Sequence, residues 1–167
     1  MICLATSGEP GFVPSLVELE PPASPYSIDT MAKLSRSLDD CESSLYFIAG
    51  ADSMVDITGW RQGKKLLSLY NFVFVSRPGV RAAPESVLPR AAVERVRDFT
   101  GTASDRVRQS LRRRGTGPAG IFMLDVGAPD ISASHIRELV SGGKRFSHLV
   151  PGPVHEYIRK LHLYGEQ

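Results

Sequence analysis

Three short apolar runs punctuate the chain, at residues 44–49, 71–76 and 121–126, and each gives way to a polar or glycine-containing turn. Runs of this length and composition are typical of strands that are buried on both faces, and the first run has the character of a central strand. Segments with apolar residues at helical spacing lie between and after these runs. Strands that alternate with helices indicate a parallel sheet with helices on both faces. The pattern therefore predicts an α/β fold.

The remaining segments predict several helices and one further strand. Residues 1–5 have the pattern of the end of an amphipathic helix, whereas residues 12–20 alternate between apolar and polar positions and predict a strand. The spacing of Ile28, Met31 and Leu34 predicts a helix with Ser27 as its N-cap. Further helices are expected at residues 62–70, 91–99 and 104–114, after residue 132, and around an apolar stripe of Val154, Tyr157, Ile158 and Leu161.

Glycines and polar residues follow each predicted strand at its carboxyl end. Gly50 and Asp52 follow the first run, an Arg-Pro-Gly turn at residues 77–79 follows the second, and residues 130–137 follow the third. Ligands of open parallel sheets bind beyond the carboxyl ends of the strands, so these loops are expected to line one crevice. The sequence contains no Walker-type or dinucleotide-type glycine fingerprint. The arrangement indicates a nucleotide or another phosphate-bearing ligand.

Two of these loops hold residues with more than one interpretation. Ser132 or Ser134 is expected to begin a helix, where free backbone N–H groups and the helix dipole favour an anion. Arg137 lies one helical turn after Ser134, so the two side chains can converge on one phosphate; a plain serine N-cap with a solvated arginine is the alternative. Asp52 can grip a ribose hydroxyl or cap the next helix, and local chemistry favours the cap.

Trp60 is the sole tryptophan and follows a glycine at a junction between a loop and a helix. A single tryptophan is commonly a core residue, although an exposed one beside a glycine can stack on a flat ring. The residues alone leave both interpretations open.

Composition adds few limits. A chain of 167 residues is expected to form one domain, spanning residues 1–167, and its net charge of +2 gives no reason by itself to expect a nucleic-acid or membrane partner. No apolar run approaches the length of a membrane span, and the two cysteines show neither a disulfide framework nor metal-ligand spacing, which fits a reducing cytoplasm. The arginine-rich residues 77–114 suit a solvated helix face better than a surface for RNA or polyphosphate.

Several motifs, taken in order, resemble those of the bacterial nicotinate-nucleotide adenylyltransferases. They are P-Y-S-I-D-T at residues 25–30, Y-F-I-A-G-A-D-S at 46–53, the Trp60 junction, F-V-F-V-S-R-P at 72–78, I-S-A-S-H-I-R at 131–137 and the closing segment at 149–164. The resemblance extends over essentially the whole chain. Ser134 stands in place of threonine in the family's I-S-x-T-x-I-R signature, and Ser27 does so in its Y-T-I-D-T motif. The resemblance implies a Rossmann-like nucleotidylyltransferase fold.

The family transfers the AMP part of ATP to the phosphate of nicotinate mononucleotide, which forms deamido-NAD and releases pyrophosphate. The resemblance thus implies a cytoplasmic enzyme of NAD biosynthesis with small-molecule substrates, ATP accompanied by Mg²⁺, and no membrane association. Its motifs assign the ATP phosphates to Ser132, Ser134 and Arg137, the adenosine side to Gly50 and Asp52, and the nicotinate pocket to Ser27, Thr30 and Trp60. The motifs at residues 26–30 and 60 are similar to the nicotinate branch of the superfamily, but acid-versus-amide preference and oligomeric state, a homo-oligomer included, stay open.

One family motif is not in this sequence. The family opens with a strand that ends in G-x-F-D-P-x-H-x-G-H, whose histidines stabilise the α-phosphate, whereas the four histidines here lie late in the chain, at His135, His148, His155 and His162. By this comparison the N-terminal strand-helix-strand unit is expected to be missing, no residue is assigned a catalytic role, and these 167 residues are expected to be impaired as a catalyst. The alternative is a non-catalytic nucleotide-binding relative whose arginine-rich segment serves a partner or RNA.

Overall fold

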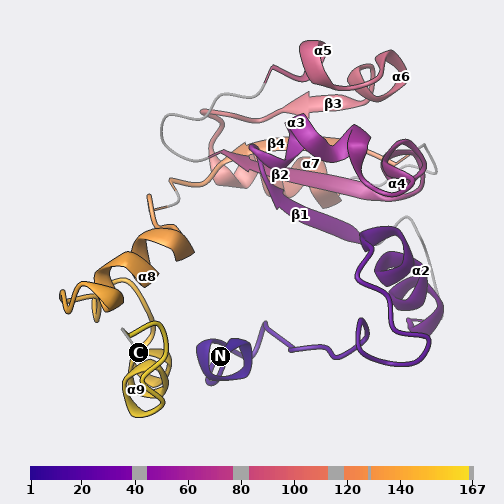
Figure 1. The fold of residues 1–167 in the computed structure, drawn as a ribbon. Helices are drawn as coiled ribbons and strands as arrows, with labels where there is room; N and C mark the ends of the chain where they lie inside the picture. Colours follow the sequence, from indigo (N-terminus) through magenta and orange to yellow (C-terminus); the bar gives the residue numbers. More distant parts are fainter. Residues whose placement is uncertain (39–44, 77–82, 113–118, 128, 166–167) are drawn as a thin grey trace. The chain divides into compact units, whose positions relative to one another are not determined.

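The computed structural model of the chain describes residues 1–38, 45–76, 83–112, 119–127 and 129–165 (Figure 1). The chain forms two compact units, one of residues 17–129 and the other of residues 1–16 with 130–167. Each unit is described below by itself, and the single domain expected over residues 1–167 stays a prediction.

The larger unit is built on a parallel sheet. Its strands are β1 (Tyr46–Gly50), β2 (Asn71–Ser76), β3 (Val96–Asp98) and β4 (Ile121–Asp125), in the order β1-β2-β4-β3. All three pairings are parallel, which confirms the predicted α/β class and the strand positions of the three apolar runs. Helix was predicted over residues 91–99, but α6 (Arg90–Val93) ends early, and β3 occupies residues 96–98 of that segment.

The register of the strands separates the two faces of the sheet. Phe47, Phe72 and Ile121 are aligned across β1, β2 and β4, and with Phe74 and Met123 they face the main core. The neighbouring positions Ile48, Val73 and Phe122 face the other side, since successive strand residues point to opposite faces.

Helices surround this sheet. They are α2 (Ser27–Ser37), α3 (Ser53–Asp56), the 3-10 turn η2 (Ile57–Gly59), α4 (Gly63–Leu69), α5 (Pro84–Val87), α6 and α7 (Ser104–Arg112). In Figure 1, α3 lies in front of the sheet and α7 behind it. The face toward α3 and α4 holds most of the core, because Met54, Ile57 and Leu66 are fully buried there. No described helix is long and apolar enough to cross a membrane.

Polar contacts hold the amino ends of the strands, away from the loops that follow them. Asn71 is buried; its side-chain amide donates to Leu45 O at 3.1 Å, and its Oδ1 accepts from Gly120 N at 2.8 Å. The half-buried Arg95 donates to the backbone carbonyls of Ala91, Leu67 and Ala119. Desolvation lowers the pKa of the Arg95 guanidinium from its usual value.

The strand predicted over residues 12–20 is wrong. In the described part of the chain this segment is irregular, and Phe12, Val13 and Leu19 are exposed. The physical reason lies in Lys33, whose Nζ donates to the carbonyls of Val17, Glu20 and Pro22 at 3.0, 2.7 and 2.8 Å. This ammonium group holds the end of the segment against α2. Alternation of apolar and polar residues predicts a strand, but a strand also needs a neighbouring strand with which to pair.

Two other expectations are corrected. The first apolar run is not central, because β1 lies at an edge of the sheet formed by the described strands and its Ile48 is 70% exposed. Ser27 is not an N-cap: α2 begins at Ser27 itself, its N-cap is Tyr26, and no side chain of the described residues caps it. Asp29 does lie in the first turn, as expected.

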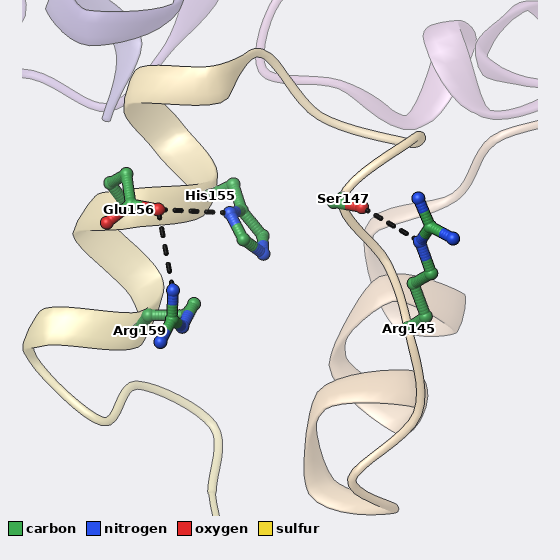
Figure 2. Close-up of polar contacts among 5 residues, drawn as sticks. All are labelled: Arg145, Ser147, His155, Glu156 and Arg159. Carbon is green, nitrogen blue, oxygen red and sulfur yellow. Dashed lines mark hydrogen bonds and ion pairs between the residues drawn. The ribbon is translucent and has the colours of Figure 1, made fainter.

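The smaller unit contains α1 (Ile2–Ala5), α8 (Ala133–Ser141) and α9 (Gly152–Lys160). Helix was expected at residues 1–5, and α1 lies there; its Leu4 packs with Phe146, Val154 and Ile158 in the core of this unit. The stripe predicted for α9 is correct in part, because Val154 and Ile158 are buried whereas Tyr157 and Leu161 are exposed. Figure 2 shows polar contacts of this unit, among them Arg145 Nε donating to Ser147 Oγ at 3.3 Å.

Candidate functional site

A pocket lies in the larger unit where the start of α2 meets the turn after η2. It has a volume of about 380 Å³ and is lined by Pro25, Tyr26, Ser27, Gly59, Trp60 and Arg61. Two of the three residues assigned to the nicotinate pocket, Ser27 and Trp60, are therefore brought together although they are far apart in the sequence. The uncapped first turn of α2 begins at this wall of the pocket.

Trp60 combines both interpretations that its sequence left open. The indole is half-buried, and its ring meets the ring of Phe47 edge-on, with the centroids 5.9 Å apart and the planes at 74°. The contact ties Trp60 to the core, and the same side chain lines the pocket. An aromatic ring that is fixed by packing and open on another side is suited to stacking against a flat ligand.

The turn that presents Trp60 and Arg61 depends on a close backbone approach. Gly63 N donates to Trp60 O at 2.8 Å, and a Cβ added at Gly63 would lie 1.9 Å from the carbonyl oxygen of Ile57. Only glycine fits there without a shift of the backbone. Gly63 thus allows α4 to begin directly against η2, which fixes the position of the pocket wall.

Sequence reasoning did not assign four of the lining residues, and Tyr26 and Arg61 are the two of these that contact each other. The guanidinium carbon of Arg61 lies 4.5 Å from the centroid of the Tyr26 ring, which is cation–π geometry. Ser27 and Trp60, which adjoin them in the sequence, were assigned to the pocket. That adjacency was the sequence feature that could have pointed to Tyr26 and Arg61. The contact itself joins two segments whose proximity only the fold reveals.

Thr30 is not among the residues that line the pocket. It lies one turn into α2, and its Oγ1 donates to Glu18 Oε1 at 2.9 Å. The Thr30 hydroxyl thus binds the same segment, around residues 17–20, to which Lys33 donates. Its assignment to the nicotinate pocket stays a prediction that the pocket lining does not support.

Gly50 and Asp52 lie at the carboxyl end of β1. Gly50 is the last residue of the strand, and Asp52 is the N-cap of α3, with its Oδ1 accepting from Ser53 N at 3.1 Å. The cap that local chemistry favoured for Asp52 is confirmed. Its side chain is exposed, so its second carboxylate oxygen can also face a ligand. The Arg-Pro-Gly turn expected at residues 77–79 lies outside the described residues.

The smaller unit places Ser132, Ser134 and Arg137 at the start of α8. Ser132 is the N-cap, and its Oγ accepts from His135 N at 3.1 Å. Arg137 Nη2 donates to Ser134 Oγ at 3.2 Å, so these two exposed side chains share one face of the helix as predicted. A serine hydroxyl, a guanidinium and the positive end of a helix dipole together suit an anion.

The site residues thus fall into separate groups. Ser27 and Trp60 share the pocket, Gly50 and Asp52 occupy a strand end in the same unit, and Ser132, Ser134 and Arg137 belong to the other unit. The single crevice expected from the sequence stays a prediction.

The fold and these strand-end loops define an α/β protein of the Rossmann-like class. No family model matches the chain. Curated relatives do: a protein of Frankia alni named "probable nicotinate-nucleotide adenylyltransferase" is 35% identical over 164 residues, which cover 98% of this chain and 70% of the relative. A protein of the same name from Geobacter sp. strain M21 is 37% identical over 166 residues, 98% of this chain and 72% of its own length.

Solved structures agree on the fold. The Plasmodium falciparum nicotinic acid mononucleotide adenylyltransferase complexed with NaAD has a TM-score of 0.54 and 15% identity, and the match covers 85% of this chain. The structure of the same enzyme complexed with APC has a TM-score of 0.53. This chain spans 58% of the length of each of those structures. The chain belongs to the nicotinate-nucleotide adenylyltransferase family, which confirms the resemblance of its motifs.

Proposed function

We propose that the chain acts as a nicotinate-nucleotide adenylyltransferase, which transfers the AMP part of ATP to nicotinate mononucleotide in the cytoplasm. The pocket carries the proposal: an indole packed edge-on against Phe47, a cation and a helix start surround a space of about 380 Å³. A flat, anionic pyridine nucleotide fits such a lining. The sequence holds only two cysteines and no disulfide framework, which suits a reducing compartment.

The reaction needs no nucleophile from the protein. A phosphate oxygen of nicotinate mononucleotide attacks the α-phosphorus of ATP, the new P–O bond forms as the bond to the bridging oxygen of the β-phosphate breaks, and pyrophosphate leaves with that electron pair. Catalysis of this type rests on positioning and on charge around the phosphates. The residues to consider are therefore those that hold anions.

Arg137 and Ser134 are proposed to hold the ATP triphosphate. The guanidinium of Arg137 lies on the face of α8 that carries the Ser134 hydroxyl. Among the described residues, that neutral hydroxyl is the group to which the guanidinium donates. A phosphate oxygen would replace or share this neutral contact with a charge-assisted one, which is roughly twice as strong. Ser132 contributes by capping the start of α8, where the helix N-terminus would face the anion.

Gly50 and Asp52 are proposed to lie against the adenosine. Gly50 ends β1 without a side chain, and Asp52 keeps one carboxylate oxygen beyond its bond to Ser53 N. A ribose hydroxyl is a suitable donor to that oxygen.

Mg²⁺ is proposed to accompany the triphosphate. Within the described residues no group of three or more His, Cys, Asp or Glu side chains could hold a metal ion. Mg²⁺ in nucleotide sites keeps several waters and binds substrate phosphates together with only one or two carboxylates. The ion would reduce the negative charge that opposes attack on the α-phosphorus.

Pyrophosphate release with ATP and nicotinate mononucleotide tests the proposal. We expect release that needs both substrates, slow in the 167-residue chain and faster in a chimera that carries the family's N-terminal histidine motif. Each preorganised donor added to an anionic transition state raises the rate by about 10²–10³-fold. Inactivity of both proteins while ATP still binds would contradict the proposal and favour a non-catalytic nucleotide-binding role.

A further inference from the structure

Trp60 stands at the end of a column of aromatic rings that leads out from the interior of the sheet. Its indole meets the Phe47 ring edge-on, with the centroids 5.9 Å apart and the planes at 74°. The Phe47 ring packs on that of Phe72 at 5.2 Å, and Phe72 stacks on Phe74 at 5.5 Å. Phe72 and Phe74 are fully buried, whereas Phe47 and Trp60 are half-buried. The column therefore joins the sheet interior to a ring that lines the pocket.

Hydrogen bonds fix the backbone of Trp60 but do not set the direction of its ring. Trp60 N donates to Ile57 O at 3.2 Å, and Trp60 O accepts from Gly63 N at 2.8 Å. These bonds hold the main chain, whereas the side-chain rotamer depends on what packs against the indole. Among the described residues, Phe47 is the one aromatic side chain whose ring contacts the indole. Phe47 is thus the residue best placed to select that rotamer.

We propose that Phe47 is a positioning residue, which holds the Trp60 indole in the orientation that receives the pyridine ring of nicotinate mononucleotide. The inference rests on the proposed function, because it takes Trp60 as the surface on which that ring stacks. Phe47 is not among the residues that line the pocket, so it acts through Trp60. The motifs of the sequence assign it no role.

The geometry of the contact suits this role. In a T-shaped pair one ring presents its edge to the face of the other, so rotation of either ring breaks the contact. A ring that is already oriented spares the ligand the entropic cost of ordering it, which would otherwise weaken binding. Phe47 is itself held in place, because it pairs with Phe72 across β1 and β2. The same strand ends at Gly50, which is proposed to lie against the adenosine, so β1 positions groups for both substrates.

Phe47→Leu tests the role, since it removes the ring but keeps an apolar side chain in the core. Nicotinate mononucleotide would be titrated against the fluorescence of Trp60, the only tryptophan. We expect its dissociation constant to rise about three- to tenfold, in the range for a side chain that binding must then order. Time-resolved fluorescence anisotropy of the ligand-free variant should show wider motion of the indole than in the unaltered chain. Phe47→Tyr, which keeps the ring, should restore most of both properties.

Phe99→Leu is the matched control. Phe99 is likewise half-buried, and its ring stacks at 6.3 Å on that of Phe122, a buried residue on the opposite face of the sheet from Phe47. The same substitution there also removes an aromatic contact with a strand residue, so a comparable loss of unfolding free energy is expected. We expect the dissociation constant to stay within about twofold and the indole motion to stay unchanged. An equal rise in both variants would overturn the inference, because lost stability would then explain it.

Other outcomes separate the inference from the proposed function. A dissociation constant within about twofold of the unaltered chain in Phe47→Leu, or a rise without added indole motion, would overturn the inference and leave the function standing. Failure of the unaltered chain to bind nicotinate mononucleotide would overturn both. If Phe47→Leu does not fold, the anisotropy of the ligand-free, unaltered chain still decides. An indole that rotates freely before the ligand binds would overturn the inference, and one that moves only with the whole molecule would support it.

Discussion

Arg137 donates a hydrogen bond from Nη2 to Ser134 Oγ at 3.2 Å in the first turns of α8. The two residues are one turn apart, so the bond follows from helical geometry and needs no distant part of the chain. It holds an exposed guanidinium on the face that also carries a hydroxyl, beside the amino end of the helix. The pair is the part of the proposed phosphate site that the structure defines most fully.

The first prediction concerns Arg137. In Arg137→Ala we expect ATP binding to weaken by about 1.5–3 kcal/mol, the range for a hydrogen bond to a charged group. Arg137→Lys should recover only part of the loss, because the planar fork is gone. Isothermal titration calorimetry with ATP gives the measurement.

Arg145→Ala is the control for that experiment. Arg145 also donates to a serine hydroxyl in the smaller unit, from Nε to Ser147 Oγ at 3.3 Å, but it lies outside α8 (Figure 2). We expect its removal to leave ATP affinity within about twofold, as for a screened surface charge. Unchanged affinity in Arg137→Ala, or an equal loss in both variants, would count against the assignment.

The second prediction separates the two serines of α8. Ser132→Ala removes the N-cap bond to His135 N and should lower the free energy of unfolding by about 0.5–2 kcal/mol. Ser134→Ala leaves the cap intact and should instead weaken ATP binding. Urea denaturation and ATP calorimetry on both variants check this, and a reversed pattern would show that the roles are exchanged.

Helix α8 illustrates what the sequence alone could predict. An apolar strand, a serine N-cap and an arginine one turn later are local features, so their geometry followed from spacing. The apolar runs likewise predicted the strands, because large apolar side chains in a short run need to be buried. Phe72 and Phe74 are indeed fully buried. The edge position of β1 could not be predicted, since it depends on which strands pair.

The pocket was predictable only in part, for a related reason. Motifs pointed to Ser27 and Trp60, but the contact of Arg61 with Tyr26 depends on how α2 and η2 approach each other. The strand predicted over residues 12–20 failed because Lys33, on another element, takes up backbone carbonyls at the end of that segment. The local pattern of apolar and polar residues does not reveal which polar groups, far apart in the sequence, will contact each other.

Trp60 carries the third prediction. Nicotinate mononucleotide should quench its fluorescence, and ATP alone should quench it less, because the pocket assigned to the pyridine ring contains the indole. As a control, Trp60→Phe should lose the signal while keeping a ring against Phe47. Equal quenching by both ligands, or none by either, would return Trp60 to a purely structural role.

The fourth prediction concerns Lys33, which holds the chain segment that leads to the pocket. Lys33→Met keeps much of the apolar stem but removes the bonds to the carbonyls of Val17, Glu20 and Pro22. We expect faster proteolytic cleavage within that segment and weaker binding of nicotinate mononucleotide, because Pro25 and Tyr26 follow directly. Lys65→Met, on the exposed side of α4, should change neither, and cleavage at the unaltered rate in Lys33→Met would refute the role.

The fate of a labelled phosphate tests the central claim most directly. ATP labelled at the α-phosphate would be incubated with nicotinate mononucleotide and either the 167-residue chain or the chimera that carries the histidine motif. AMP transfer predicts that the α-label appears in the dinucleotide deamido-NAD, while a γ-label appears in pyrophosphate. Recovery of the α-label in free AMP, or in unchanged ATP with both proteins although ATP binds, would contradict the account.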